Sequence, residues 1–135
     1  MAVHLELVVL GPPVSNQSPG ANLTTWRATV AGAATLNWPN PSLTAELKAI
    51  IINFYAGNRP SVDVDNLSKP ILDVMQNIVY NDDRQIVQAE ITHLKIGAAF
   101  SILGVRPVIV NSILSGNQFV YVRIEDAVDP FLLPK

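Results

Sequence analysis

The chain has 135 residues, a length that suits one domain with a hydrophobic core and is short for two. It contains no cysteine, which excludes disulfide bridges and thiolate metal sites, and no apolar run in it is long enough to span a membrane as a helix. The net charge of −2, taken alone, argues against a nucleic-acid partner.

The first predicted element is a strand at residues 2–10, where apolar and polar side chains alternate. Residues 11–20 contain three prolines and two glycines and therefore predict a loop. The alanine-rich residues 23–34 predict a short helix, with Thr24 or Thr25 as its N-cap. Prolines that follow this stretch end the helix.

The middle of the chain predicts a strand, a helix and a turn. Residues 45–55 are β-branched and aromatic in their second half, which favours a strand. Apolar residues at helical spacing predict a helix over residues 68–77, with Pro70 in its first turn. Residues 80–85 are typical of a turn.

The last part of the chain begins with an alternating strand at residues 86–96. One face of this strand is expected to carry Val87, Ala89 and Ile91. A helix follows, with Pro107 near its start and Gly116 just past its end. Residues 117–125 predict the final strand, and residues 126–135 have no clear assignment.

Strands and helices thus alternate along the chain, which predicts one α/β or α+β domain over residues 1–135. Apolar residues make up 49% of the chain and charged residues only 15%, which indicates a buried interface between subunits. We expect part of this interface at residues 108–114 or at a strand edge near them. The alternative is an unusually apolar monomer. No feature of a signal peptide is present, and we expect a cytoplasmic protein with no membrane contact.

Five of the eleven acidic residues fall within residues 61–85, at Asp63, Asp65, Asp73, Asp82 and Asp83. In an extended backbone, residues two apart carry both carboxylates on one side of the chain, as expected for Asp63 and Asp65. Asp83 follows a predicted helix of about ten residues, which spans only about 15 Å. Oxygen ligands of this kind suit Mg²⁺ or Mn²⁺ rather than zinc.

Other interpretations of these acids remain open. Aspartates commonly cap helices and occupy turns, which is the simpler interpretation of Asp73 or Asp82 taken singly. For Asp63 and Asp65, followed by Lys69, this interpretation is weaker. A calcium-binding EF-hand loop is a further alternative, but its glycine and its terminal glutamate are missing at the required spacing.

The stretch DVDNLSKPILDVMQNIVYNDDRQI, residues 63–86, resembles the signature of the RusA family, the Holliday junction resolvases of bacteria and their phages. Family members show an Asp-x-Asp-Asn start, a lysine shortly after it, a helix containing Leu-Asp or similar, and an Asp-Asp pair before a strand. This sequence has each of these features. The resemblance implies a small α/β domain with a mixed β-sheet flanked by helices, which works as a homodimer with Mg²⁺, and Mn²⁺ is a candidate substitute.

The resemblance also implies roles for single residues. The family's metal-binding catalytic carboxylates match Asp63, Asp65 and Asp83. A lysine needed for cleavage matches Lys69. Motif positions with a supporting role match Asn66, Asp73 and Asp82. The chemistry agrees, because phosphodiester hydrolysis needs an activated water and a stabilised leaving oxygen, which carboxylate-held Mg²⁺ supplies. A nearby ammonium adds positive charge for the scissile phosphate.

Positive charge is scarce for a DNA-binding protein, since the chain has only nine lysines and arginines and family members are usually basic. If bound cations neutralise four of the aspartates, seven acids remain against nine bases, and the protein becomes mildly basic. The best candidates for DNA phosphate contacts are Arg27, Arg59 and Arg84, although a solvated surface charge is the alternative for each. We expect structural roles for Tyr80, His4 and His93.

The sequence therefore predicts a homodimeric, Mg²⁺-dependent DNA endonuclease that cuts four-way junctions by paired nicks. A two-fold dimer presents two identical sites to a nearly two-fold symmetric junction, so symmetric incisions follow. The alternative is a non-catalytic DNA-binding module that keeps the fold with an occupied metal site.

Overall fold

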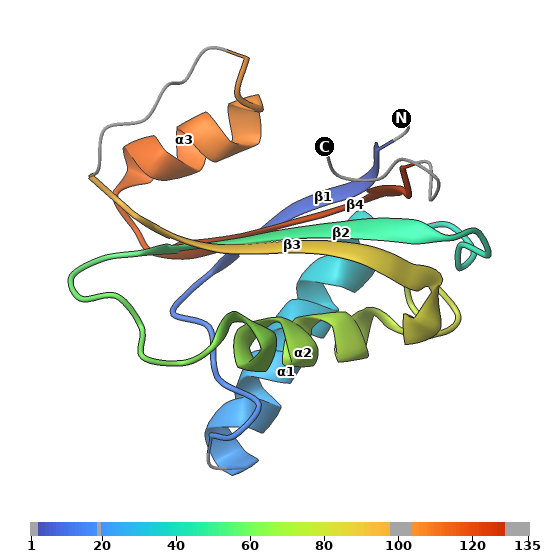
Figure 1. Ribbon diagram of the computed structural model, residues 1–135, viewed down its shortest axis with the longest axis horizontal. Coiled ribbons are helices and arrows are strands. Elements are labelled where there is room, and N and C mark those ends of the chain that lie inside the picture. Colours follow the sequence, from blue (N-terminus) through green and yellow to red (C-terminus); the bar gives the residue numbers. More distant parts are fainter. Residues whose placement is uncertain (1–2, 19, 98–103, 129–135) are drawn as a thin grey trace, which may run out of the picture.

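Alternating apolar residues build one mixed sheet in the computed structural model, which describes residues 3–18, 20–97 and 104–128 (Figure 1). Its strands are β1 (Val3–Leu10), β2 (Leu47–Tyr55), β3 (Ile86–Lys95) and β4 (Phe119–Asp126). They lie in the order β1-β4-β2-β3, with β2 and β3 parallel and the other neighbours antiparallel. The predicted α/β fold with a mixed sheet is confirmed.

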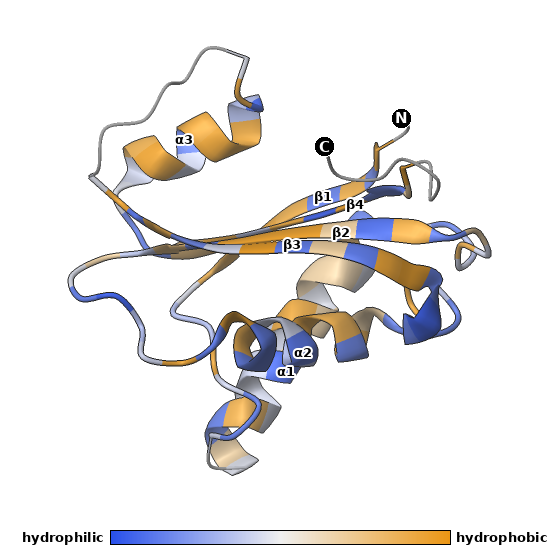
Figure 2. Cartoon of the chain, in the orientation of Figure 1, coloured by the Kyte–Doolittle hydropathy of each residue, from blue (hydrophilic) through white to orange (hydrophobic). Residues whose placement is uncertain are grey.

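Helices cover both faces of this sheet. Helices α1 (Gly20–Asn37) and α2 (Val64–Met75) lie against one face, and α3 (Pro107–Ser115) lies over one end of the other (Figure 1). The main core forms between the sheet and the first two helices. In α1 the buried residues recur at four-residue spacing, at Trp26, Val30 and Ala34. Apolar residues of the strands pack against apolar residues of both helices. Figure 2 marks apolar residues in orange on the strands and on both helices.

A smaller core lies beneath α3, where Ile109 packs near Phe54, Phe119 and Tyr121. The rings of Phe54 and Phe119 stack with their centroids 4.4 Å apart. The helix has the predicted Pro107 in its first turn, and Gly116 adopts a left-handed conformation with φ 78° as its C-cap. The predicted end signals of this helix are confirmed.

Several predicted boundaries were wrong. Helix α1 is longer at both ends, so Thr25 lies inside it, where its hydroxyl donates to the Ala21 carbonyl at 3.1 Å instead of capping the N-terminus. Thr24 likewise lies within α1. In β3 the pairing to β2 is irregular between Ile86 and Gln88, which leaves Val87 exposed rather than on the face shared by Ala89 and Ile91.

Helix α2 connects the parallel strands β2 and β3, so its N-terminus lies beyond the carboxyl end of β2. In such α/β units ligands bind outside the carboxyl ends of the strands. The acidic motif begins here, because Asp63 and Asp65 lie at the start of α2.

Candidate active site

The N-terminus of α2 holds two aspartates that serve no capping role. Asp63 occupies the N-cap position with extended backbone angles, but its side chain makes no capping hydrogen bond. Instead its carbonyl accepts the backbone amides of Asn66 at 3.1 Å and Leu67 at 3.3 Å. Asp65 lies in the first turn of the helix, so the expectation that both aspartates lie in extended backbone was wrong for Asp65.

The early start of α2 depends on how the helix accommodates Pro70, which lies in its interior and not in its first turn. Proline has no amide hydrogen, so the carbonyl of Asn66, four residues earlier, loses its partner within the helix. The backbone amide of Asn16 donates to this carbonyl at 2.8 Å. Asn66 thereby ties the loop after β1 to the first turns of α2.

A cavity of about 410 Å³ opens at the α2 N-terminus, with Asp63, Asp65, Arg59 and His93 among its lining residues. Arg59 is exposed and makes no ion pair within the described residues. The backbone amides of the first helical turn add partial positive charge. Two carboxylates and one unpaired guanidinium therefore line the same cavity.

His93 supports this cavity from β3. Its Nε2 lies 3.3 Å from the carbonyl oxygen of Val62, the residue before Asp63. Its Nδ1 lies 3.1 Å from Nδ2 of Asn53, the cross-strand neighbour on β2. The predicted structural role of His93 fits these bonds, but the sequence offered no signal that its ring would lie beside the aspartates. The other histidine, His4, pairs with Asp126 at 2.7 Å.

A second cavity, of about 290 Å³, runs along α2 toward β3. Asp65, Lys69 and Asp73 follow one another at four-residue spacing on the helix and line it together with Asp83. Lys69 Nζ lies 3.5 Å from Asp73 Oδ2, and Arg27 from α1 donates to the same oxygen at 3.2 Å. Asp73 therefore pairs with two positively charged side chains. Arg27, which was predicted to contact DNA, is one of them and already has a carboxylate partner.

Asp83 belongs to the opposite end of α2 from Asp63. It begins a short 3₁₀ helix (Asp83–Gln85), and its backbone amide donates to Gln76 Oε1 at 3.1 Å, just past the helix end. Along an α-helix the rise from Asp65 to Gln76 is about 16 Å. Within residues 3–18, 20–97 and 104–128, no three His, Cys, Asp or Glu side chains form a group that could hold one metal ion.

The structure thus brings Asp63 and Asp65 together, and brings Asp65 and Asp83 to one elongated cavity, but it does not gather all three carboxylates. The pair fits magnesium, because Mg²⁺ is usually bound by one or two carboxylates and keeps several waters beside the phosphates of its substrate. Because the Asp63 side chain makes no capping hydrogen bond, its carboxylate oxygens are available to bind a metal ion.

Asp82, next to Asp83, behaves differently. Its side chain accepts from the backbone and the guanidinium of Arg84 and forms a capping box with Gln85. The hydrogen bonds from Arg84 hold the pKa of Asp82 well below its ordinary value. The capping interpretation of Asp82 is confirmed, and Arg84 already has a carboxylate partner.

Tyr80 lies in the core, as expected, and its hydroxyl donates to the Leu72 carbonyl at 2.5 Å. Burial raises the pKa of Tyr80, and the negative charges of Asp73 and Asp83 act in the same direction.

Comparison with protein families finds a match between residues 18–102 and the family model for endodeoxyribonuclease RusA. The matched segment covers more than half of the chain and includes Asp63, Asp65, Lys69 and Asp83. A search of curated proteins finds no match. Among the residues that the structure describes, no helix is long and apolar enough to cross a membrane.

Proposed function

The chain belongs to the RusA family of DNA endonucleases, and from this membership we propose that it is a Mg²⁺-dependent enzyme that resolves four-way DNA junctions by paired symmetric nicks. The observation that carries the proposal is that Asp63 and Asp65 line one open cavity and neither forms an ion pair with a described residue, although Arg59 lines the same cavity. Neighbouring carboxylates without an ion-pair partner favour a bound divalent ion.

In the proposed site, Asp63 and Asp65 hold the cation at the N-terminus of α2. A magnesium ion bound there would lower the pKa of its water and would stabilise the negative charge on the leaving oxygen. Arg59, on the same cavity, contacts the phosphate backbone of the DNA strand. Asp83 lies past the C-terminal end of α2, and Asp83→Asn tests whether it contributes to metal binding.

Lys69 lies one helical turn after Asp65 and offers its ammonium to the scissile phosphate. Asp73 restrains Lys69 through their ion pair, and its second partner, Arg27, fixes Asp73 against α1. These contacts limit the motion of a long side chain before DNA binds, which lowers the entropy lost on binding. Asp73 therefore acts as a positioning residue.

Paired incisions require two sites, so we propose a homodimer. Helix α3 supports this proposal, because it buries Ile109 against the sheet while Leu114 keeps 78% of its surface exposed. Sedimentation at micromolar protein should show a species near twice 14.6 kDa. Leu114→Asp should shift this species toward the monomer if α3 forms the interface. A wild-type monomer at that concentration would contradict the paired-nick mechanism.

The decisive experiment compares a synthetic four-way junction with a linear duplex of the same length, each incubated with Mg²⁺ or with EDTA. We expect symmetric nicks in the junction alone, and only with Mg²⁺, and we expect Asp65→Asn to abolish them. Junction binding without cleavage at any Mg²⁺ or Mn²⁺ concentration would favour the non-catalytic DNA-binding module.

A further inference from the structure

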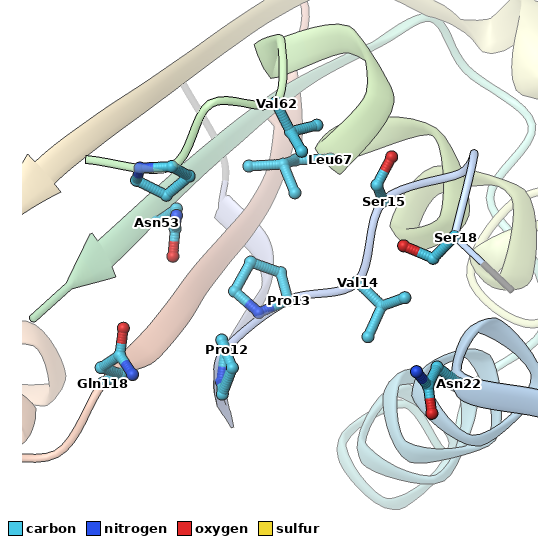
Figure 3. Close-up of a pocket in the computed structure, with 11 residues that line it drawn as sticks. Pro12, Pro13, Val14, Ser15, Ser18, Asn22, Asn53, Val62, Leu67 and Gln118 are labelled. Atoms are coloured by element: carbon cyan, nitrogen blue, oxygen red, sulfur yellow. The ribbon is translucent and has the colours of Figure 1, made fainter. Parts of the chain in front are cut away.

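A third cavity, of about 250 Å³, lies beside the aspartate cavity and shares the residues Pro60 and Val62 with it (Figure 3). Its walls come from the loop after β1, the start of α1, the end of β2, the segment that enters α2, and the residue before β4. A water molecule occupies about 30 Å³, so this space is large enough for a planar heterocycle. None of the described residues that line it is charged.

One buried polar group points into this space. Asn53 is only 4% exposed, and its amide group pairs with His93 Nδ1. The Val62 carbonyl can only accept, so His93 Nε2 is the donor of that bond, and the other ring nitrogen, Nδ1, faces Asn53. Asn53 presents Nδ2 to this nitrogen at 3.1 Å.

The carboxamide oxygen of Asn53 is consequently directed into the cavity. Figure 3 shows this oxygen pointing toward the space near Pro13 and Gln118. Within the described part of the chain, Asn53 Oδ1 has no hydrogen-bond partner. This oxygen is reached from the cavity rather than sealed in the core, so a ligand or water there can complete its hydrogen bonding.

Gln118 supplies a hydrogen-bond donor, where Asn53 supplies an acceptor. The backbone amide of Ala56 donates to Gln118 Oε1 at 3.1 Å, which leaves Nε2 as the free donor of this side chain. In Figure 3 the oxygen of Gln118 lies on the side toward Asn53, and the nitrogen lies on the side toward Pro12. The backbone of Gln118 is held as well, because its carbonyl accepts from Gly11 at 3.0 Å. The His93 ring orients the amide of Asn53 and the Ala56 backbone orients that of Gln118, so the cavity wall offers one acceptor and one donor.

The remaining walls suit the faces of a flat ring. Pro12, Pro13 and Pro60 present rigid apolar surfaces, and proline is among the side chains that insert between DNA bases. The loop that carries Pro12 and Pro13 is anchored to α2 through the bond between Asn16 and Asn66. The cavity walls are thus restrained before any ligand enters.

We propose that this cavity receives one unstacked nucleobase from the DNA strand beside the cleaved phosphate, and so makes cleavage depend on base identity. The inference rests on the proposed function. A neutral cavity cannot compensate a phosphate, whereas a nucleobase edge carries adjacent donors and acceptors that match Asn53 Oδ1 and Gln118 Nε2. A base costs least to unstack where its pairing is already disturbed.

The test uses the full-length protein and junctions that carry 2-aminopurine at single positions on either side of the mapped cut. With Ca²⁺ in place of Mg²⁺, binding should raise 2-aminopurine emission at one position, because the base leaves the stack. An abasic site at that position should weaken binding of the wild-type protein by roughly tenfold. This measurement needs no variant and therefore does not depend on whether a variant folds.

Gln118→Glu sharpens the test, because it keeps the acceptor for the Ala56 amide and replaces the donor Nε2 beside Pro12 with an acceptor. We expect it to lose the emission increase and the preference among the four bases at that position. The matched control is Gln17→Glu, which adds the same charge at an exposed position of the loop after β1 and should behave as wild type.

The outcomes separate the two proposals. If the wild type cuts junctions but shows no unstacked base and no dependence on base identity, the cavity inference is overturned and the endonuclease proposal stands. Equal losses in Gln118→Glu and Gln17→Glu would also overturn it, since added charge alone would explain them. A wild type that never cuts junctions refutes the proposed function, whereas an emission increase would still support base binding.

Discussion

Two groups of acids on opposite sides of the sheet differ in how their charge is offset. On the α3 side, Glu6, Glu90 and Glu125 each form an ion pair, at 2.9 Å with Arg106, 2.9 Å with Lys48 and 2.8 Å with Arg123. On the α2 side, Asp63, Asp65 and Asp83 form no ion pair with any described residue. The first group is stabilised by the protein's own cations, whereas the second leaves its charge available to a ligand.

The same contrast occurs between neighbours in the chain. Asp82 caps the 3₁₀ helix and binds Arg84, whereas Asp83 lines the cavity along α2. Charged groups that are held together without partners cost stability, and such costs are typical of functional sites. Paired acids should therefore affect stability when replaced, and unpaired acids should affect activity.

The largest effect is expected from Asp65→Asn. It removes a proposed metal ligand at nearly constant volume, so junction cleavage should fall by at least roughly 100-fold. The thermal unfolding midpoint should stay the same or rise, because a repulsive charge is removed. Asp63→Asn should have the same effects on cleavage and on the unfolding midpoint as Asp65→Asn. Asp82→Asn is the control and should lower the midpoint while retaining cleavage. Native cleavage rates in Asp65→Asn would remove it from the ligand set.

Lys69→Met should have the next largest effect. Losing the ammonium should slow cleavage by about 10- to 100-fold under single-turnover conditions, with little change in junction affinity measured in Ca²⁺. Asp73→Asn should give a smaller loss, because Lys69 remains but is no longer held. Lys48→Met, which removes a paired lysine on the other face, serves as the control. A loss of affinity that accounts for the whole rate effect would assign Lys69 to binding alone.

Asp83→Asn should strengthen DNA binding in EDTA several-fold, because a carboxylate that repels the phosphate backbone is removed. Each charge near DNA changes the salt dependence by roughly one unit of slope. Gel-shift titrations at two salt concentrations measure both quantities, and the gap to wild type should narrow when Ca²⁺ is added. Glu90→Gln makes the same charge change on the other face of the sheet. If Asp83→Asn binds no more tightly than this control, Asp83 lies away from the DNA path.

The smallest effect concerns Glu6. The hydrogen bond from Arg106 lowers the pKa of Glu6 below its ordinary value of 4.5. The folded state therefore favours the charged carboxylate, and this stabilisation is present at pH 7 and is lost as the pH falls below 4.5 through the lowered pKa. Glu6→Gln should lower the free energy of unfolding by about 1 kcal/mol at pH 7.

Urea unfolding of Glu6→Gln at pH 7 and at pH 3 measures this difference, which should shrink at the lower pH. Glu46→Gln provides the control, because Glu46 is exposed and forms no ion pair with the described residues. A deficit that is equal at both pH values would show that packing of the side chain, and not its charge, stabilises the fold.

Much of the fold followed from local patterns. Alternation of apolar residues located β1 and β3 to within a few residues, β-branched and aromatic content located β2, and Pro107 with Gly116 marked the helix before β4. These signals are local because side-chain alternation and backbone preferences act over a few residues. The acidic motif was equally visible, since its residues lie close together in the sequence and resemble one family.

The tertiary structure decided the features that depend on contacts between distant segments. Pro70 lies inside α2 because Asn16, far away in sequence, satisfies the carbonyl of Asn66. Asn53 and His93 meet across two strands and orient each other beside Val62. Asp83 is separated from Asp63 by the length of α2. The sequence by itself determined which residues carry the chemistry, and packing between segments determined which of them share a cavity, because local preferences carry no information about the distance between remote side chains.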